Sequence, residues 1–455
     1  MGSTNHRELH IIGMLPHRAL EALSKKYGPI MLVQLGNIPT IVVSSPYAAE
    51  HFLKTHDMTF ASRPNIQTAK YLSYVSKGMA FTTYRGKIDG YRAMRKKEME
   101  ALVRQLKVAT VATVTAREVV DLSEKVEGVM KDMTCKMVFG RSSDERFDLK
   151  AIVQKSLVLV EAFNIADFVP TLAPFDLQGL TRSFKETRKA IDTILEIIIT
   201  EHKQDPSRIH QTHEKKDFID VMLSLMNNKS STTTHDELFY SIDHNNFKAI
   251  AIDMIVGAID TSTTAIEWVM LEILTHPMVA QKLQQELMSV VEGERMVVET
   301  DLVKLEYLQM VITETLRIHL VAPLLIPRES MEDIVIDDYF IPKNSRILVN
   351  SWAMGRDPSI WFDNVGEFLL ERFMDGHMDI RGRDFQLIPF GSGRRGCPGM
   401  HLGLTNIRLV VAQLMHYFDW ELPKGMKPNE LDMSEKFGLS LPRAKHLLAI
   451  PTYRL

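Results

Sequence analysis

Cysteine is scarce in this chain, and its scarcity limits the kinds of site that the chain can build. Only two cysteines, Cys135 and Cys397, occur among 455 residues. Two cysteines cannot form a disulfide framework, and a zinc ribbon needs four ligands. This usage is typical of a protein that folds in a reducing compartment or faces one.

The chain also lacks a long uncharged apolar run and a strong charge of either sign. No window of about 18 residues is both apolar and free of charge. The best candidate, residues 249–274, contains Asp253, Asp260 and Glu267, and the N-terminal stretch MGSTNHRELH is too polar for a signal peptide. The net charge of −3 gives no general attraction to nucleic acid or to an anionic membrane. We therefore expect no membrane-spanning segment and no nucleic-acid partner.

What is present is a mainly helical pattern with small patches of strand. No internal repeat and no Pro/Gly linker divides the chain, so we predict one domain of mainly α structure with small β-sheets (α+β). Helical periodicity dominates residues 92–274, with interruptions at 166–179 and 227–237. The other expected elements are a hairpin in 31–45 around Gly36-Asn37, a long helix over 247–275 stopped by Pro277, a helix over 301–319, strands within 326–350, and a last helix from just after Cys397 to 418.

One loop combines glycine, arginine and a cysteine in an unusual density. Residues 389–400 read PFGSGRRGCPGM and lead directly into the last predicted helix. A thiolate at Cys397 would be favoured by Arg394, by Arg395 and by the positive end of that helix. Zinc would need further nearby ligands, and only His401 is close in sequence. A single thiolate suits a ligand that brings its other donors with it, such as a haem. The alternative, an inert cysteine in a turn, does not account for the rest of the loop.

The loop resembles the haem-binding signature of cytochrome P-450 monooxygenases. The matching residues are Phe390, Gly393, Arg395, Cys397 and Gly399. The resemblance implies that Cys397 is the proximal iron ligand of haem b, that Arg395 pairs with a propionate, and that Phe390 packs near the sulfur. A thiolate ligand donates electron density to the iron and favours O–O cleavage.

Two further segments add residues to the implied haem site. In the family, the arginine of a segment like HLVAPLLIPRE (319–329) contacts a propionate, which nominates Arg328. The same segment and the turn FGLSL (437–441) resemble parts of the family's substrate pocket. The implied pocket residues are Val256, Ala258, Val321, Leu324 and Leu439. Apolar side chains at these places imply an apolar substrate, although ordinary core packing would select the same residue types.

A charged pair in the helix over 301–319 has two interpretations. Glu314 and Arg317 are three residues apart on one helix face, and such pairs are usually solvated. In this context they resemble the family's E-x-x-R pair, which a third arginine completes. The segment LERF (370–373) nominates Arg372 for that role, with Leu370 where proline is usual. The resemblance implies a buried structural triad, and such a triad is stable only if all of its charges are paired and hydrogen-bonded.

A polar interruption lies in the middle of the long helix. Residues 257–262 read GAIDTS, and a threonine hydroxyl can bond back to the i−4 carbonyl and bend a helix. Alone, such a run is usually a polar face. Beside the haem loop it resembles the family's distal motif, which implies that Asp260 and Thr261 are catalytic and relay protons. The implied architecture has this long central helix over the haem and the cysteine loop beneath it.

Two pieces of the family pattern are missing. Residues 1–8 do not match it, so we expect a catalytic domain over 9–455 without the N-terminal membrane anchor. The family's W-x-x-x-R helix is also absent. All four tryptophans lie in the C-terminal half, and the sequence over 81–100 reads as if a segment had been excised after Tyr84, near 84–87.

The resemblance implies a haem-thiolate monooxygenase, similar to the plant A-type group of specialised metabolism. Its partners would be O2, a small lipophilic substrate (aromatic, phenylpropanoid or terpenoid), and an NADPH-cytochrome reductase that could meet a basic face at Arg394 and 96–97. Family members are found at the cytosolic face of the endoplasmic reticulum membrane. A branch that rearranges hydroperoxides fits poorly, because this chain retains Asp260-Thr261 and has no insertion before Cys397. A second reading is an inactive or haem-deficient truncated remnant of such an enzyme.

Overall fold

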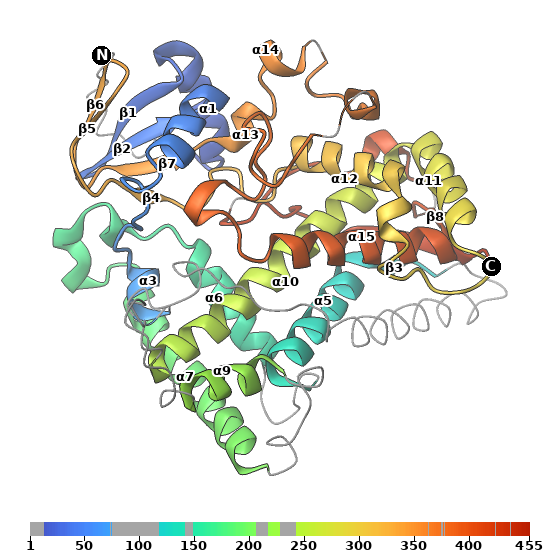
Figure 1. The fold of residues 1–455 in the computed structure, drawn as a ribbon, viewed down its shortest axis with the longest axis horizontal. Helices are drawn as coiled ribbons and strands as arrows, with labels where there is room; N and C mark the ends of the chain where they lie inside the picture. Colours follow the sequence, from blue (N-terminus) through green and yellow to red (C-terminus); the bar gives the residue numbers. More distant parts are fainter. Residues whose placement is uncertain are drawn as a thin grey trace, which may run out of the picture.

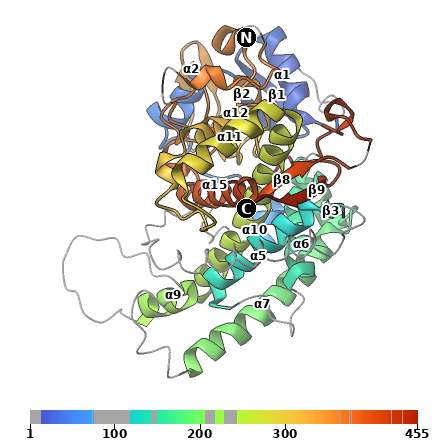
Figure 2. The ribbon, with the colours of Figure 1, turned by 90° about the vertical axis from the view of Figure 1, so that its right-hand side faces the viewer.

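The computed structural model has a small sheet region at one end and a larger helical region beside it (Figures 1 and 2). The structure describes residues 13–72, 74, 118–141, 149–205, 217–227, 243–362, 364–374, 376, 378–423, 425–436 and 438–455. The segment 81–100, where a W-x-x-x-R helix is expected, lies outside the described residues, as do the interruption at 228–237 and Lys96 and Lys97.

Helices make up most of the described chain. The α-helices are α1 Pro16–Tyr27, α2 Pro46–Glu50, α3 Gln67–Tyr71, α5 Leu122–Phe139, α6 Leu149–Glu161, α7 Leu180–Gln204, α9 Phe218–Asn227, α10 His244–Thr275, α11 Pro277–Val290, α12 Glu306–Ile318, α13 Ser351–Met354, α14 Pro358–Trp361 and α15 Met400–Tyr417. Shorter helical turns include η2 His51–Thr55, η5 Ile165–Asp167, η6 Pro170–Phe175, η8 Leu302–Lys304, η9 Leu370–Phe373 and η10 Gly393–Arg395. The predicted mainly helical class is confirmed.

The strands form small sheets, as expected. The largest has the order β1 Ile30–Leu35, β2 Ile38–Val43, β7 Arg346–Val349, β4 Arg328–Glu329. The others pair β3 Val120–Asp121, β9 Leu448–Tyr453 and β8 Phe418–Glu421, and β5 Ile334–Ile336 with β6 Tyr339–Ile341. Leu35 pairs with Ile38, and Gly36 between them has φ +59°, which glycine adopts without strain. The predicted hairpin is therefore confirmed.

The long predicted helix is the centre of the molecule. α10 begins three residues earlier than expected, because the Asp243 side chain and Asn246 form a reciprocal cap at its N-terminus. It packs against α5, α12 and α15, and Figure 1 shows it running diagonally through the helical region. By length and mean hydropathy (1.4), α10 is the one helix among the described residues that could cross a membrane. A buried core helix meets the same criteria, and that is the position of α10 here.

Two separate apolar cores lie along α10. The N-terminal half, up to Ile259, packs into a core with α5, α7 and α9. The C-terminal half, from Ala265, packs into a second core with α11, α12 and α15. The polar run over 260–264 therefore falls at the junction of the two cores, which explains how such residues are tolerated in the middle of a core helix.

The remaining helix predictions differ from the structure only at their ends. The helix expected over 301–319 begins with the separate turn η8, and α12 itself starts at Glu306. The last helix, α15, starts three residues after Cys397, as expected. The interruption predicted at 166–179 contains η5 and η6 rather than an α-helix.

Candidate functional site

The cysteine loop is fixed in shape by its glycines and by backbone hydrogen bonds. Gly393 has φ +68°, and a Cβ atom there would lie 2.0 Å from the carbonyl oxygen of Leu53 in η2. The Cys397 N–H donates to the Phe390 carbonyl oxygen at 2.8 Å, which closes the loop. Phe390 itself packs against the core that contains α15. Only glycine fits at position 393, because the loop and η2 are in direct backbone contact.

The Cys397 thiol is accessible, yet the protein around it opposes its ionisation. Desolvation raises the pKa of Cys397, and a hydrogen bond from the Gly399 backbone N–H opposes that effect. The adjacent arginines form their own contacts with other groups. Arg394 pairs with Asp57 at 3.0 Å, and Arg395 donates its Nε–H to the Ala61 carbonyl at 2.7 Å. Ionisation of the thiol therefore depends on what binds to the sulfur.

Three arginines gather beside this loop. Burial, and then the charges of Arg328 and Arg395, lower the pKa of Arg63 to about 9. Burial and the charge of Arg395 lower the pKa of Arg328 to about 10, while Asp57 opposes the shift. Arg328 donates Nη2–H to the Ser392 carbonyl at 2.8 Å. Its Nη1 is buried without a hydrogen-bond partner in the described part of the chain. A cationic cluster with an unused buried donor fits an anionic group such as a carboxylate.

Arg63 is a member of this cluster that sequence reasoning missed. It donates Nη1–H to the carbonyls of Ile326 and Pro327, at 2.7 and 3.0 Å. The contact arises because Ser62 forms a β-bridge with Glu329, next to Arg328 in sequence. The two segments are more than 250 residues apart in the chain. No local motif around Arg63 indicates that it contacts the segment of Arg328.

The distal pair lies on α10 in two different environments. The Thr261 hydroxyl donates to the Gly257 carbonyl at 2.6 Å, the i−4 bond expected from the sequence. Asp260 accepts a hydrogen bond from the hydroxyl of Ser440, in the C-terminal turn. Burial raises the pKa of Asp260, whereas Ser440 and Lys436 oppose the increase. The carboxyl therefore holds its proton more firmly than an exposed aspartate does.

The five predicted pocket residues come from three places in the chain. Val256 and Ala258 are half-buried on α10, Val321 and Leu324 are half-buried after α12, and Leu439 is exposed. The backbone N–H of Leu441 donates to the Val321 carbonyl at 2.8 Å, which joins the segment after α12 to the C-terminal turn. The structure thus links two of the predicted pocket segments directly.

The charged triad is buried and well bonded. Arg317 donates Nε–H and Nη2–H to the two carboxylate oxygens of Glu314, each at 2.7 Å, and both side chains are 0% exposed. The Nε of Arg372 lies 3.5 Å from Glu314 Oε1. The carboxylate also accepts the backbone N–H of Leu369 at 3.0 Å. The solvated surface pair that this spacing usually indicates is excluded here.

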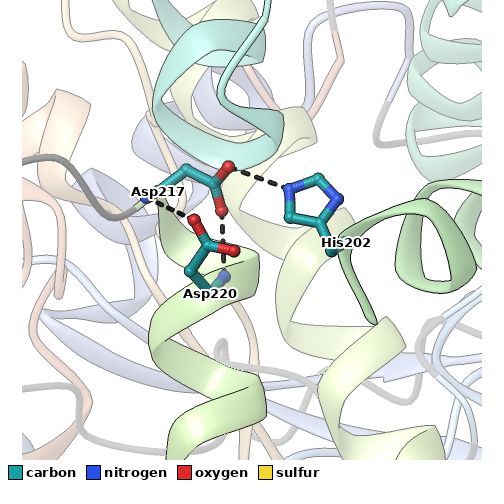
Figure 3. Close-up of side chains that lie close together, drawn as sticks. All are labelled: His202, Asp217 and Asp220. Atoms are coloured by element: carbon teal, nitrogen blue, oxygen red, sulfur yellow. Dashed lines mark hydrogen bonds and ion pairs between the residues drawn. The ribbon is translucent and has the colours of Figure 1, made fainter. Parts of the chain in front are cut away.

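A separate cluster of potential metal ligands lies between α7 and α9 (Figure 3). It contains His202, Asp217 and Asp220. The two aspartates exchange hydrogen bonds with each other's backbone N–H, which caps the N-terminus of α9, and His202 Nε2 lies 2.9 Å from Asp217 Oδ2. Helix capping and a histidine–aspartate contact account for these side chains, so the cluster alone does not indicate a metal.

Comparison with known proteins gives a consistent result. A family model described as Cytochrome P450 matches residues 4–449. Cytochrome P450 CYP736A12 of Panax ginseng is 55% identical over 464 residues, which cover 98% of this chain and 91% of the relative. The premnaspirodiene oxygenase of Hyoscyamus muticus is 35% identical over 98% of this chain and 90% of its own. Desmethyl-deoxy-podophyllotoxin synthase of Sinopodophyllum hexandrum is 37% identical over 97% and 89%.

A solved structure agrees with the sequence relatives. A zebrafish cytochrome P450, solved with abiraterone, superimposes with a TM-score of 0.78 at 25% identity and covers 97% of this chain and 100% of its own. The family model and the relatives span almost the whole chain, and a backbone hydrogen bond closes the cysteine loop. The chain therefore belongs to the cytochrome P450 family, as an oxidoreductase of the monooxygenase type whose cofactor is haem b.

Proposed function

We propose that this protein inserts one oxygen atom from O2 into a C–H bond of a small lipophilic plant metabolite. Electrons would come from NADPH through a flavoprotein reductase. The observation that carries the proposal is the accessible sulfur of Cys397 in a closed glycine loop, beside a cluster of buried arginines. Cys397 would hold the iron of a haem, and the arginines would hold its two propionate carboxylates.

Each residue of the loop region has a distinct role in holding the cofactor. Cys397 would bind the iron, and Phe390 and Gly393 would set the position of the sulfur through the closed loop. Arg63, Arg328 and Arg395 would bind the propionates, because a carboxylate would offset the burial and the mutual repulsion that lower the pKa of Arg63 and Arg328. When bound, thiolate-ligated haem supplies the activation of O2 that the side chains cannot perform.

The distal residues Asp260 and Thr261 would transfer protons to the reaction site. Burial raises the pKa of Asp260, so it holds a proton more firmly than an exposed aspartate does, and the neighbouring Thr261 is exposed. A carboxyl beside a hydroxyl at a buried helix junction can pass protons one at a time to a site that excludes bulk water. The triad of Glu314, Arg317 and Arg372 would hold the neighbouring core in place and take no part in the chemistry.

The substrate class rests on the pocket and on the relatives. The predicted pocket residues are apolar, and two relatives are named premnaspirodiene oxygenase and desmethyl-deoxy-podophyllotoxin synthase. We infer a terpenoid-like or phenylpropanoid-like substrate for this chain. Arg394 is more than half exposed and could face an acidic reductase. The family relationship supports a location at the cytosolic face of the endoplasmic reticulum, with residues 9–455 as one catalytic domain.

One spectroscopic experiment tests the proposal. The purified, haem-supplemented protein is reduced under CO, and its absorption is compared with that of Cys397→Ser and of Cys135→Ser. The wild type and Cys135→Ser should both give the band of thiolate-ligated haem, because Cys135 is buried in α5 away from the loop. Cys397→Ser should lose it. A wild type without haem absorption would favour the haem-deficient remnant, and a band retained in Cys397→Ser would assign the ligand elsewhere.

A further inference from the structure

A polar seam runs from Asp260 to the protein surface, between α10 and the C-terminal segment 440–447. Asp260, Thr263 and Glu267 stand at i, i+3 and i+7 on α10, a spacing that places them on one helix face. The segment follows that face: the Ser440 hydroxyl donates to Asp260, and the Trp268 Nε1–H donates to the Leu441 carbonyl at 3.0 Å. Figure 2 shows β9, which follows this segment in the chain, beside α5.

Glu267 is a buried carboxyl for which the reaction described above has no use. It is 8% exposed, and no ion pair within 4 Å joins it to another described side chain. The Ser123 hydroxyl of α5 is the hydrogen-bonding side chain that acts on the pKa of Glu267. That serine oxygen already accepts the Leu447 backbone N–H at 2.8 Å, so its own proton is available to Glu267.

Burial leaves Glu267 protonated more readily than an exposed glutamate. Burial raises the pKa of Glu267, and the charge of Asp260 adds to this increase. The increase is opposed by the Ser123 hydrogen bond and by the charges of Arg443 and His446. The resulting pKa lies above the ordinary value. Asp260 and Glu267 are therefore two carboxyls on one helix face that are both biased toward the protonated form.

Two buried side chains in the seam have hydrogen-bond donors left over. The Thr263 hydroxyl lies between the two carboxyls on the helix face and has no partner among the described residues. Arg443 is 7% exposed and donates Nη2–H to the Asp432 carbonyl at 2.9 Å, while its Nε and Nη1 have no partner in the same part of the chain. Buried groups of this kind are normally satisfied by ordered water. The Thr263 hydroxyl and the two unbonded Arg443 nitrogens could therefore hold bridging water molecules in the seam.

The surface end of the seam is a histidine. His446 is exposed, and its Nδ1 lies 2.7 Å from Asp121 Oδ2. The Asp121 hydrogen bond raises the pKa of His446; burial opposes this, and the charges of Asp121, Glu267 and Glu127 support it. A histidine with a raised pKa exchanges protons with bulk water near neutral pH.

We propose that Glu267 is a positioning residue that resupplies Asp260 with protons taken from solvent at His446, through water held in this seam. The proposal rests on the function proposed above. Asp260 releases its proton toward Thr261 and becomes a carboxylate. Glu267 then returns a proton to it through water, and the His446 imidazolium reprotonates Glu267 and regains its proton from bulk water. Each group ends as it began, and no electrons move.

The competing explanation is that Glu267 only anchors the C-terminal segment to α10 and α5. An anchor would affect stability, whereas a proton donor affects rates, isotope effects and the protonation seen by spectroscopy. Glu267→Gln separates the two, because glutamine keeps the shape and can still bond Ser123 but cannot release a proton. Glu272→Gln is the matched control: it is equally buried on α10, but histidine hydrogen bonds lower the pKa of Glu272 to about 2, so it carries no proton at pH 7.

The first measurement is infrared absorption of the purified protein as the pH is lowered toward the ordinary glutamate pKa, which does not depend on turnover. Glu267→Gln should remove one C=O band of a carboxyl that becomes protonated above that ordinary pKa, and Glu272→Gln should leave the bands in this pH range unchanged. A spectrum of Glu267→Gln that matches the wild type in this region would overturn the proposal. This result stands whether or not the protein retains haem, so it separates this proposal from the proposed function.

The second measurement is NADPH oxidation by the haem-loaded protein with an added flavoprotein reductase, in H2O and in D2O. Glu267→Gln should oxidise NADPH about tenfold more slowly with a larger solvent isotope effect. This is less than the roughly 10²–10⁴-fold contribution of a donor that acts on the reacting group, because Glu267 acts through Asp260. Its haem content and CO spectrum should not change. His446→Gln should abolish the loss of rate that the wild type shows as the pH rises through the raised pKa of His446. If Glu267→Gln lowers only the melting temperature, Glu267 is an anchor and the proposal is wrong.

Discussion

Removal of Glu314 should cost this protein a large part of its stability. In Glu314→Ala, the guanidinium of Arg317 loses both of its 2.7 Å hydrogen bonds to the carboxylate. Arg372 loses its 3.5 Å ion pair, and the Leu369 N–H loses its acceptor. Arg317 keeps three backbone carbonyls, those of Gly355, Val365 and Glu367, at 2.8 to 3.1 Å. Its charge nevertheless stays buried without a counter-ion, because Arg317 is fully shielded from solvent.

The magnitude follows from the burial of the pair. Removing one partner of a buried ion pair costs about 3–5 kcal/mol, because the remaining charge is uncompensated. Domains are stable by about 5–15 kcal/mol, so this loss is roughly a fifth of the total or more. The surface pair of Glu50 and Lys54 offers a control with a similar distance, 2.5 Å, but with both side chains largely exposed. Solvent screening limits an exposed pair of this kind to a few tenths of a kcal/mol.

The assay is urea unfolding of the wild type, Glu314→Ala and Glu50→Ala, followed by far-ultraviolet circular dichroism. We expect a large decrease in the midpoint for Glu314→Ala and almost none for Glu50→Ala. Arg317→Met combined with Glu314→Ala should recover part of the loss, because the uncompensated charge is then gone. Equal midpoints for the two single variants would show that the buried triad contributes no more than a surface pair, and would refute the reasoning.

Two further predictions concern the cysteine loop and the response to pH. Gly393→Ala should destabilise the protein by at least about 1–2 kcal/mol through its left-handed φ alone, and it should lower haem retention because the new Cβ would lie 2.0 Å from the Leu53 carbonyl oxygen. The control is Gly128→Ala in α5, where nothing lies within 4 Å, and this variant should be neutral or slightly stabilising. Normal haem binding by Gly393→Ala would contradict the loop geometry. The pKa of Glu272 is lowered from 4.5 to about 2 by hydrogen bonds from His276 and His319, which outweigh the opposing effect of burial. Because the folded pKa is below the unfolded one, this stabilisation is complete above about pH 4.5 and is lost as the pH falls toward 2. Melting temperature measured against pH should therefore fall less steeply in that window for Glu272→Gln than for the wild type, and parallel curves would reject the assignment.

Much of the fold could be predicted because the signals are local. A hairpin needs Gly36 at a positive φ between two β-rich runs, and Pro277 stops α10 because proline disfavours a helical residue before it. The loop at 389–400 carries its chemistry in consecutive residues, so Cys397 could be found without a structure. The exact helix starts could not be predicted, since they depend on caps such as the Asp243 side chain.

The site contacts that sequence reasoning missed all join distant segments of the chain. Arg63 joins Arg328 only because Ser62 bridges to Glu329. The arginines beside Cys397 bond to Asp57 and to the Ala61 carbonyl, which come from a distant part of the chain. Ser440, which bonds Asp260, lies 180 residues away from it in the chain.

The amino-acid sequence alone determined the helical class, the central helix, the cysteine loop and the family resemblance, because each of these is encoded in neighbouring residues. Only the tertiary structure decided which charges meet, which are buried, and in which direction each pKa moves. Electrostatic energies depend on distance and on the exclusion of water, and both are set by segments that the chain brings together when it folds.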